Sequence, residues 1–248
     1  MNTKQDKKLS FANIAIEVTR KCNMHCAHCM RGDAQNADIS EGKLSKFLSQ
    51  VNFIGSLTIT GGEPTLNVNA IKAILTYCKL FNIPVMDFYV VTNGKEITTE
   101  FLNSLIDWYV YCIECGGEPE LCGIALSQDV FHESIPHENF AKLRALSFFR
   151  PDDKNTRQWK QPPLINLGRA RQLQEYTKRN VCRIEEIDVS TQDDTIFVND
   201  TPIAFTVNGD ILYDCDYEYE EENDIKICSF ENAAETFYKI ATDPNFTL

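Results

Sequence analysis

The chain has 248 residues, of which 43% are hydrophobic and 24% are charged, a composition typical of a globular protein with one sizeable buried core. No apolar stretch approaches the roughly 20 residues that span a bilayer, and the polar start of the chain lacks the apolar segment of a signal peptide. We therefore expect a cytoplasmic protein without a membrane partner. The formal net charge of −12 argues against general nucleic-acid binding, which needs a broad basic face.

The charge is unevenly distributed along the chain. Residues 142–183 hold 11 Lys and Arg against 3 Asp and Glu, whereas residues 184–248 hold 2 against 17. The simpler interpretation is that two solvated faces attract each other across the fold. The alternative is that the basic segment, which contains Trp159, faces an anionic or aromatic group of a substrate.

Apolar runs alternate with helical patterns in the first 150 residues. Four segments have the pattern of buried strands: residues 12–18, 56–60, 85–94 and 122–129. Each strand is followed by an amphipathic helical pattern: residues 40–51, with Ser40 as the expected N-cap, 68–81, 98–111 and 137–149. Repeated strand–helix pairs predict a parallel sheet with helical crossovers.

Two later segments are expected to extend this sheet. Residues 163–173 have the pattern of a fifth strand that turns into a helix, and residues 183–190 that of a sixth strand. The predicted fold class is therefore α/β, a partial (β/α)6 TIM-like barrel whose functional loops lie at the carboxyl ends of the strands.

We divide the chain into a core of residues 1–190 and a small acidic C-terminal β extension of residues 191–248. Within the extension, short antiparallel strands are expected around the turns Asn199-Asp200 and Asn208-Gly209.

The sequence CNMHCAHC at residues 22–29 places three cysteines and two histidines within eight residues. Zinc sites built from two cysteine pairs need two well-separated pairs, and only one such run is present here. Soft thiolates clustered on one loop also suit iron–sulfur clusters. The spacing favours a cluster but leaves zinc open.

The longer string EVTRKCNMHCAHCMRG, which follows the first predicted strand, resembles the cluster loop of the radical SAM superfamily. The resemblance implies that Cys22, Cys26 and Cys29 hold a [4Fe-4S] cluster, with S-adenosylmethionine on the remaining iron. It also implies that neither histidine of the run is a cluster ligand. His28 occupies a position that is usually aromatic in that family, and we include it among the residues expected near the cofactor.

The segment Gly61-Gly62-Glu63-Pro64 directly follows the second predicted strand. Glycines at a strand end let the backbone approach a ligand closely, and a carboxylate can accept a hydrogen bond from an ammonium group. The resemblance implies that this GGEP segment contacts the amino group of S-adenosylmethionine. A second GGEP, at residues 116–119, precedes the fourth strand and is interpreted as an ordinary turn at the opposite end of the fold.

Other polar residues and a glycine follow the ends of strands three, four and five, and relatives often contact the cofactor from such positions. The candidates are Thr92, Asn93, Ser127, Asp129, Asn166, Gly168 and Arg169, with His132 as a weaker one. The alternative for each is ordinary turn chemistry, which uses the same residue types.

The remaining cysteines are more simply interpreted as free thiols than as a second metal site. Those considered for a second site are Cys112, Cys115, Cys122, Cys182, Cys215 and Cys228.

The resemblance implies an oxidoreductase-type radical SAM enzyme. A reduced flavodoxin or ferredoxin would supply one electron, S-adenosylmethionine would be cleaved to methionine and a 5′-deoxyadenosyl radical, and this radical would abstract hydrogen from a substrate. Peptide modification is slightly favoured; a nucleotide or small-molecule radical enzyme and an enzyme activase are the alternatives. Outside this class, a zinc-binding interaction module or an iron–sulfur redox sensor would also account for the cysteines.

Overall fold

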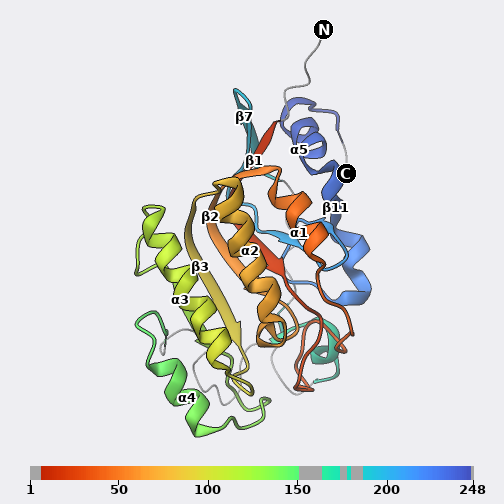
Figure 1. Cartoon of the computed structure of the whole chain (residues 1–248). Coiled ribbons are helices and arrows are strands. Elements are labelled where there is room, and N and C mark those ends of the chain that lie inside the picture. The colour runs from red at the N-terminus through yellow and green to blue at the C-terminus, as the bar shows by residue number, and fades with distance from the viewer. Residues whose placement is uncertain (1–6, 151–163, 174–177, 180–186, 247–248) are drawn as a thin grey trace.

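The computed structural model describes residues 7–150, 164–173, 178–179 and 187–246, and its main feature is one large twisted sheet (Figure 1). The strand order is β11-β10-β9-β1-β2-β3-β4, with β8 also paired to β1 and β7 paired to β8. The four strands that begin the chain are β1 (Lys8–Glu17), β2 (Val51–Thr60), β3 (Val85–Thr92) and β4 (Gly123–Leu126). Each pairs in parallel with the next, which confirms the predicted parallel sheet.

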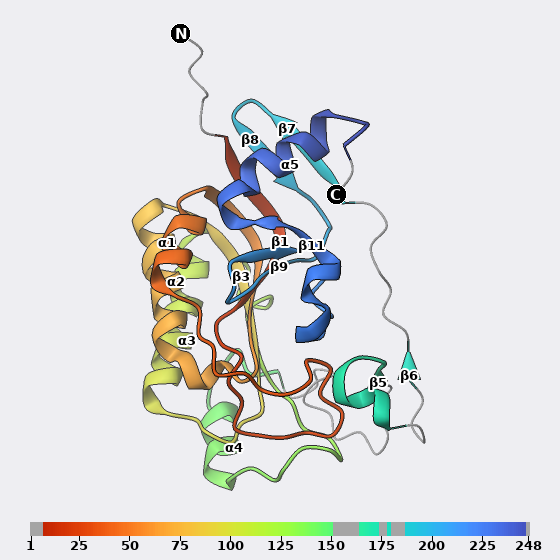
Figure 2. The ribbon, with the colours of Figure 1, turned by 90° about the vertical axis from the view of Figure 1, so that its right-hand side faces the viewer.

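Helices connect these strands at the expected places. They are α1 (Glu41–Leu48), the 3-10 helix η1 (Pro64–Asn67), α2 (Val68–Phe81), α3 (Thr99–Glu114) and α4 (His137–Arg144). Ser40 caps α1 as predicted, because its side chain accepts a hydrogen bond from the Lys43 amide at 3.3 Å. Figure 2 shows that α1, α2 and α3 all cover one face of the sheet.

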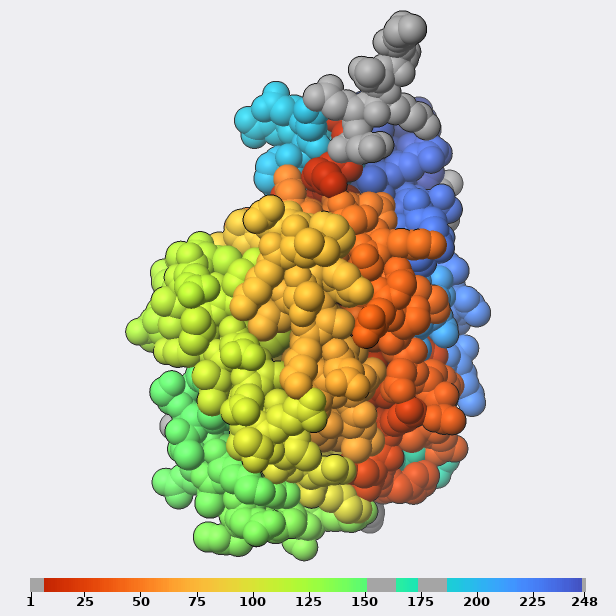
Figure 3. All heavy atoms as spheres, in the orientation of Figure 1, coloured from red at the N-terminus to blue at the C-terminus, as the bar shows by residue number. Residues whose placement is uncertain are grey.

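The core lies between that face and the three helices. Trp108 of α3 and Phe88 of β3 are fully buried there, with ring centroids 6.4 Å apart. The space-filling view shows the side chains of α1, α2 and α3 lying side by side over the strands (Figure 3). The amphipathic pattern predicted these helices because the same apolar residues that define it are the ones that face the sheet.

The C-terminal strands belong to the same sheet. They are β7 (Val189–Gln192), β8 (Thr195–Val198), β9 (Ile203–Phe205), β10 (Asp210–Leu212) and β11 (Lys226–Ser229). The turn at Asn208-Gly209 joins antiparallel β9 and β10 as predicted, with Gly209 at φ +90. The hairpin predicted at Asn199-Asp200 is wrong, because β8 and β9 both run parallel to β1, one after the other.

The predicted partial barrel is not confirmed. Strand β5 (Leu164–Ile165) pairs only with β6 (Lys178–Arg179), in a separate two-stranded sheet, and the main sheet is open over the described residues. Residues 189–192, at the end of the predicted sixth strand, pair antiparallel with β8 instead. The segment predicted at 163–173 as a strand that turns into a helix is a short strand, β5, followed by the 3-10 helix η2 (Gly168–Gln172).

The end of the chain holds elements that the sequence patterns did not predict. These are the 3-10 helices η3 (Tyr219–Ile225) and η4 (Phe230–Asn232) and the helix α5 (Ala233–Thr242). Phe237 of α5 is fully buried against Phe11 of β1, so the helix packs on the main core. In the described parts of the chain, no helix combines the length and the hydropathy of a membrane span.

Candidate functional site

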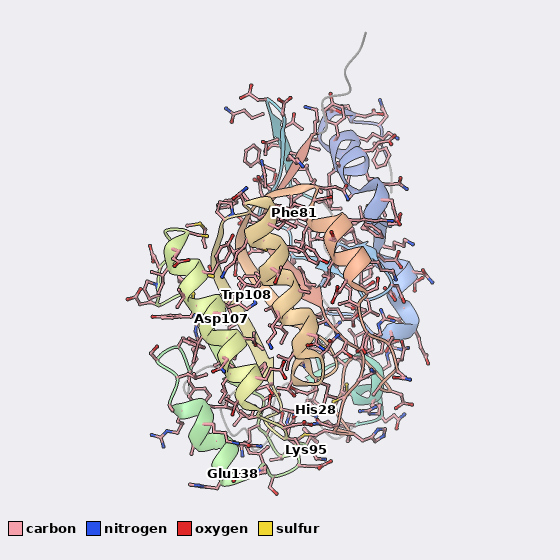
Figure 4. The ribbon with its side chains drawn as sticks, in the orientation of Figure 1. His28, Phe81, Lys95, Asp107, Trp108 and Glu138 are labelled. Carbon is pink, nitrogen blue, oxygen red and sulfur yellow. The ribbon has the colours of Figure 1, made fainter. Side chains whose placement is uncertain are left out.

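Strand register places the predicted motifs along one edge of the sheet. Glu17 of β1 lies opposite Thr60 of β2, and Thr92 of β3 lies opposite Leu126 of β4. The carboxyl ends of four strands therefore meet, and the segments that follow them gather there. Figure 4 shows His28 and Lys95 at this end of the molecule, with Phe81 at the opposite end.

The cysteines lie on a long loop, residues 20–37, which we call the cluster loop. Its two ends are hydrogen-bonded to each other, with the Arg20 amide donating to the Ala37 carbonyl at 2.8 Å and the Gln35 amide to the Arg20 carbonyl at 3.0 Å. Just outside the loop, the Thr19 hydroxyl donates to the Asp38 carboxylate at 2.6 Å. The base of the loop is therefore closed by the protein's own bonds.

Arg169 holds the side of the cluster loop from a distant part of the chain. Its guanidinium donates to the carbonyls of Cys26 at 3.0 Å and Gly32 at 2.6 Å, and it pairs with Asp33 at 2.7 Å. Its backbone amide donates to the Cys29 carbonyl at 2.9 Å. Arg169 was predicted to contact the cofactor; in the structure its hydrogen bonds position the cluster loop.

Gly168 allows this contact because it has no side chain. Its φ of +51 lies in the left-handed region, and a Cβ atom there would collide with the backbone of Cys29, Met30 and Gly32. Its amide also donates to the Glu218 carboxylate. The glycine is thus required by the close approach of η2 to the cluster loop.

Replacement of Gly168 with Ala is expected to lower the free energy of unfolding by at least roughly 1–2 kcal/mol, the cost of a left-handed non-glycine residue, and to lower iron content as the loop shifts. Denaturant melts and iron analysis would check both. Gly42→Ala in α1 is the matched control, because a Cβ atom at Gly42 meets nothing within 4 Å. Equal stability of the two variants would contradict the role given to Gly168.

Asn93 and Lys95 hold the other side of the cluster loop. The side-chain amide of Asn93 donates to the side-chain oxygen of Asn23 at 2.9 Å, and the same nitrogen lies 3.9 Å from the sulfur of Cys22. Lys95 donates to the Asn23 carbonyl at 2.8 Å. Asn93 was predicted to contact the cofactor, and in the structure it reaches Cys22, a predicted cluster ligand. Hydrogen-bond donors to the sulfurs of an iron–sulfur cluster are one means of tuning its reduction potential.

The three thiols are half-buried and unbridged, on one loop. Burial raises the pKa of Cys22, and burial followed by the neighbouring charges of Cys22 and Cys29 raises the pKa of Cys26 to about 12. Crowded thiolates of this kind need a cation to offset their repulsion. Among the described residues, these thiols do not form a donor set for one ion. Soft thiolates gathered on one loop suit an iron–sulfur cluster.

Glu63 of the GGEP segment joins two strand ends. The Glu63 residue is 1% exposed. Its carboxylate accepts hydrogen bonds from the Thr92 hydroxyl at 2.7 Å, from the backbone amide of Asn93 at 2.8 Å and from the backbone amide of Thr65 at 3.2 Å. Burial raises its pKa, against the effect of these donors. Thr92 and Glu63, both predicted cofactor contacts, are thus bonded to each other, and their contact with a cofactor stays a prediction.

The two glycines of the segment lie against the start of the cluster loop. A Cβ atom at Gly61 would collide with the Thr19 carbonyl, and one at Gly62 with the Lys21 carbonyl. Pro64 is buried as the first residue of η1. The close approach that requires these glycines is therefore to the protein's own backbone, and an additional approach to a ligand stays a prediction.

His28 meets the residues after β4. Its Nε2 lies 3.3 Å from an Asp129 oxygen, the other Asp129 oxygen lies 2.8 Å from Nδ1 of His132, and the Ser127 hydroxyl lies 3.0 Å from Nε2 of His132. Burial lowers the pKa of His28 to about 4, so the ring is neutral near pH 7. The structure brings together Ser127, Asp129 and His28, three predicted cofactor contacts.

Sequence reasoning missed the buried charges that attach the C-terminal segment to this site. Arg20 is 3% exposed and bridges Glu17 at 3.0 Å and Glu222 at 2.7 Å, with its guanidinium 4.4 Å from the ring centroid of Tyr219. Arg31 donates to the Tyr217 carbonyl at 2.9 Å. Glu222 belongs to the predicted acidic C-terminal extension, and no local pattern indicated this role.

A pocket of about 300 Å³ lies beside the cluster loop, between it, η2 and η3. Its lining includes Arg31, Asp33, Arg171, Glu218 and Tyr219. Arg171 pairs with Glu218 at 2.8 Å and with Glu221 at 2.7 Å, so a residue of the basic segment meets the acidic segment. These pairs agree with the interpretation that the basic segment 142–183 and the acidic segment 184–248 attract each other. Trp159 of the basic segment lies outside the described residues.

Asn166 lies at the surface, whereas Cys112 and Cys122 are buried in the main core. Asn166 is exposed, and its carbonyl accepts from Arg171 at 3.3 Å. Cys112 and Cys122 are hydrogen-bonded to each other, which raises the pKa of Cys112 and lowers that of Cys122. Among the described residues no metal-ligating group of three includes these thiols, Cys115, Cys215 or Cys228; Cys182 lies outside the described residues.

These features define a class: an α/β protein with a three-cysteine loop at the carboxyl ends of parallel strands. Residues 16–111 match the model of the Radical SAM superfamily. Members of the superfamily are enzymes that use a [4Fe-4S] cluster and S-adenosylmethionine. The match agrees with the enzyme class and the two cofactors expected from the sequence.

Two archaeal relatives match different parts of the chain. The uncharacterized protein MJ0907 of Methanocaldococcus jannaschii is 33% identical over 70 residues, which cover 27% of this chain and 24% of the relative. The putative glycyl-radical enzyme activating enzyme MJ1227 of the same organism is 24% identical over 204 residues, 66% of this chain and 84% of the relative. The chain thus spans about a quarter of the length of MJ0907.

Two solved structures resemble the fold more distantly. Streptococcus suis SuiB bound to the precursor peptide SuiA has a TM-score of 0.44 and 16% identity, over 97% of this chain and 67% of that chain. Native anSMEcpe with bound AdoMet and Cp18Cys peptide has a TM-score of 0.47 and 10% identity, over 95% of this chain and 81% of that chain.

Proposed function

We propose that the protein is a radical SAM enzyme whose Cys22, Cys26 and Cys29 hold a [4Fe-4S] cluster with S-adenosylmethionine beside it. The observation that carries this proposal is the placement of three half-buried, unbridged thiols on one loop at the carboxyl ends of parallel strands. When bound, the cluster held by Cys22, Cys26 and Cys29 and the S-adenosylmethionine beside it would supply one-electron radical chemistry able to take a hydrogen atom from a substrate.

The chain's own contribution is to fix and shield the cluster loop. Arg169 holds the carbonyls of Cys26 and Cys29, and Asn93 directs an amide toward Cys22. A loop fixed in this way need not reorganise when the thiolates bind metal, which favours a single geometry. Half-burial of the thiols limits access of water to them.

We place the electron donor, a reduced flavodoxin or ferredoxin, at the exposed part of the cluster loop. His25 and Ala27 are exposed between the three cysteines, so a partner can approach the cluster from that side. The donor delivers one electron for each S-adenosylmethionine cleaved. It does not need to enter the pocket beside η2 and η3.

We place the substrate in that pocket and favour a polypeptide. The pocket is polar and carries charges of both signs, from Arg31, Asp33 and Glu218, which suits the mixed donors and acceptors of a peptide segment. The name of the relative MJ1227 favours a second candidate, activation of another enzyme by hydrogen abstraction from its backbone. A nucleotide or small-molecule substrate is the remaining alternative.

The test begins with anaerobic purification and measurement of iron, sulfide and zinc. We expect about four irons and four sulfides per chain, and 5′-deoxyadenosine after reduction with S-adenosylmethionine present. Zinc in place of iron would indicate an interaction module. A cluster that cycles between redox states but gives no 5′-deoxyadenosine would indicate a sensor, and either result would overturn the proposal.

The substrate class needs a separate comparison. Cells with and without the gene would be profiled for modified peptides and for metabolites. A modified peptide, or a glycyl radical that appears in a second enzyme only when the gene is present, would support a polypeptide substrate. A change confined to nucleotides or small molecules would contradict it.

A further inference from the structure

We propose that His28, Asp129 and His132 bind a divalent transition-metal ion at a site separate from the cysteines. One ligand atom from each residue can be chosen so that all lie within 4.8 Å of one another, and no other group of three in the described part of the chain does so. The three residues come from the cluster loop and from the segment after β4. This inference does not rest on the proposed function.

The distances are close to those that a metal ion requires. Zinc binds histidine nitrogen and carboxylate oxygen at about 2.0–2.2 Å, so neighbouring ligands of a tetrahedral ion lie roughly 3.3 Å apart. One Asp129 oxygen lies 3.3 Å from Nε2 of His28, and the other lies 2.8 Å from Nδ1 of His132, so the carboxylate faces both nitrogens. The remaining adjustment is a closer approach of the two histidine rings, whose centroids are 4.8 Å apart.

Neighbouring groups orient the three side chains. The Ser127 hydroxyl lies 3.0 Å from Nε2 of His132, so Nδ1 of that ring is directed to Asp129. The Phe131 amide donates to Asp129 at 2.8 Å, and the Phe131 ring stacks on His28 with centroids 4.8 Å apart. Metal-binding histidines and carboxylates are regularly held by such outer contacts.

The polar contact of the His28 ring is made on one side only. Its Nδ1 is buried and has no hydrogen-bond partner in the structure. The ring therefore makes its polar contact through Nε2 alone, and that atom faces Asp129. Nε2 is therefore the atom through which His28 would bind an ion shared with Asp129.

The donor set indicates the class of metal. Two imidazoles and one carboxylate suit Zn²⁺ or Fe²⁺, whereas Ca²⁺ and Mg²⁺ prefer oxygen ligands. Three protein ligands leave at least one position for water or another group. The ion would tie the cluster loop to residues 127–132, and it would occupy the atoms through which His28 and Asp129 were expected to contact S-adenosylmethionine.

The experiment uses the protein with its cluster reconstituted, dialysed against micromolar Zn²⁺. Zinc is counted by mass spectrometry, and its ligands are identified by X-ray absorption at the zinc edge, where iron does not interfere. We expect about one zinc per chain with nitrogen and oxygen ligands near 2.0–2.1 Å. Asp129→Asn and His132→Gln should lose this zinc, and Ser127→Ala should weaken its binding about 10–100-fold.

His25→Gln is the matched control, because His25 lies exposed on the same loop and outside the group. It should bind zinc as the unaltered protein does. Absence of zinc from the unaltered protein, equal zinc in Asp129→Asn, or sulfur ligands near 2.3 Å would overturn the inference. Iron and sulfide are measured in every sample, so failure of the zinc site is distinguished from failure of the cluster.

Discussion

Replacement of any one of Cys22, Cys26 and Cys29 with Ala is expected to reduce 5′-deoxyadenosine formation to the level of a protein-free assay. The loop has no spare thiol, because the other cysteines that the structure describes lie outside it. A cluster held by two thiolates loses a ligand on one iron and is expected to dissociate or degrade. Iron content, the electron paramagnetic resonance signal of the reduced protein and the yield of 5′-deoxyadenosine would be measured together.

Cys115→Ala is the matched control for this series. Cys115 is half-buried like the three loop cysteines, but it follows α3 and lies outside the cluster loop. It should keep its iron and its activity. Retention of a full cluster in all three loop variants would exclude these residues as the ligand set. Loss of iron from Cys115→Ala would instead indicate that the thiol has an unrecognised role.

Replacement of Arg20 with Met is expected to lower the free energy of unfolding by about 3–5 kcal/mol, because removal of one member of a buried ion network leaves the others uncompensated. Glu17 and Glu222 both pair with Arg20, and each carboxylate has a second oxygen that is buried without a partner. Amides of Val207 and Asn208 also donate to these carboxylates but carry no charge. Urea denaturation would measure the change.

Arg171→Ala is the control for charge removal at the same end of the molecule. Arg171 also bridges two glutamates, Glu218 and Glu221, but its side chain is 44% exposed. Exposed ion pairs contribute about 0–1 kcal/mol to the free energy of unfolding, so this variant should have nearly the same free energy of unfolding as the unaltered protein. Similar stability of the two variants would mean that water reaches the Arg20 network. A loss of iron in Arg20→Met would show that the network also positions the cluster loop.

The sequence predicted the eight elements of the first 150 residues because each has a periodic apolar pattern with turn residues around it. The α2 helix agrees with its prediction at both ends. The later part of the chain lacks such patterns. Leu164–Ile165 pairs with a distant dipeptide, and strands β8 and β9 join β1 from the far end of the sequence. Such pairings depend on long-range contacts that local periodicity does not encode.

The site shows the same division. Cys22, Cys26 and Cys29 were found from spacing and resemblance, because all three donors lie within eight residues. The residues that hold their loop come from elsewhere. Gly168 and Arg169 lie about 140 residues after the cluster loop in the sequence, and they were predicted to contact the cofactor. No role was predicted for Arg20.

The sequence by itself determined the elements of the first 150 residues, the parallel order of the first four strands and the position of the three-cysteine loop, because these depend on short-range patterns. Only the tertiary structure decided that the main sheet is open and that the C-terminal strands join β1. It also decided that Glu63, Asn93 and Arg169 bond to the protein around the cluster loop. The physical reason is that a side chain's hydrogen-bond partners are set by which segments meet in space, and those segments are separated by most of the chain.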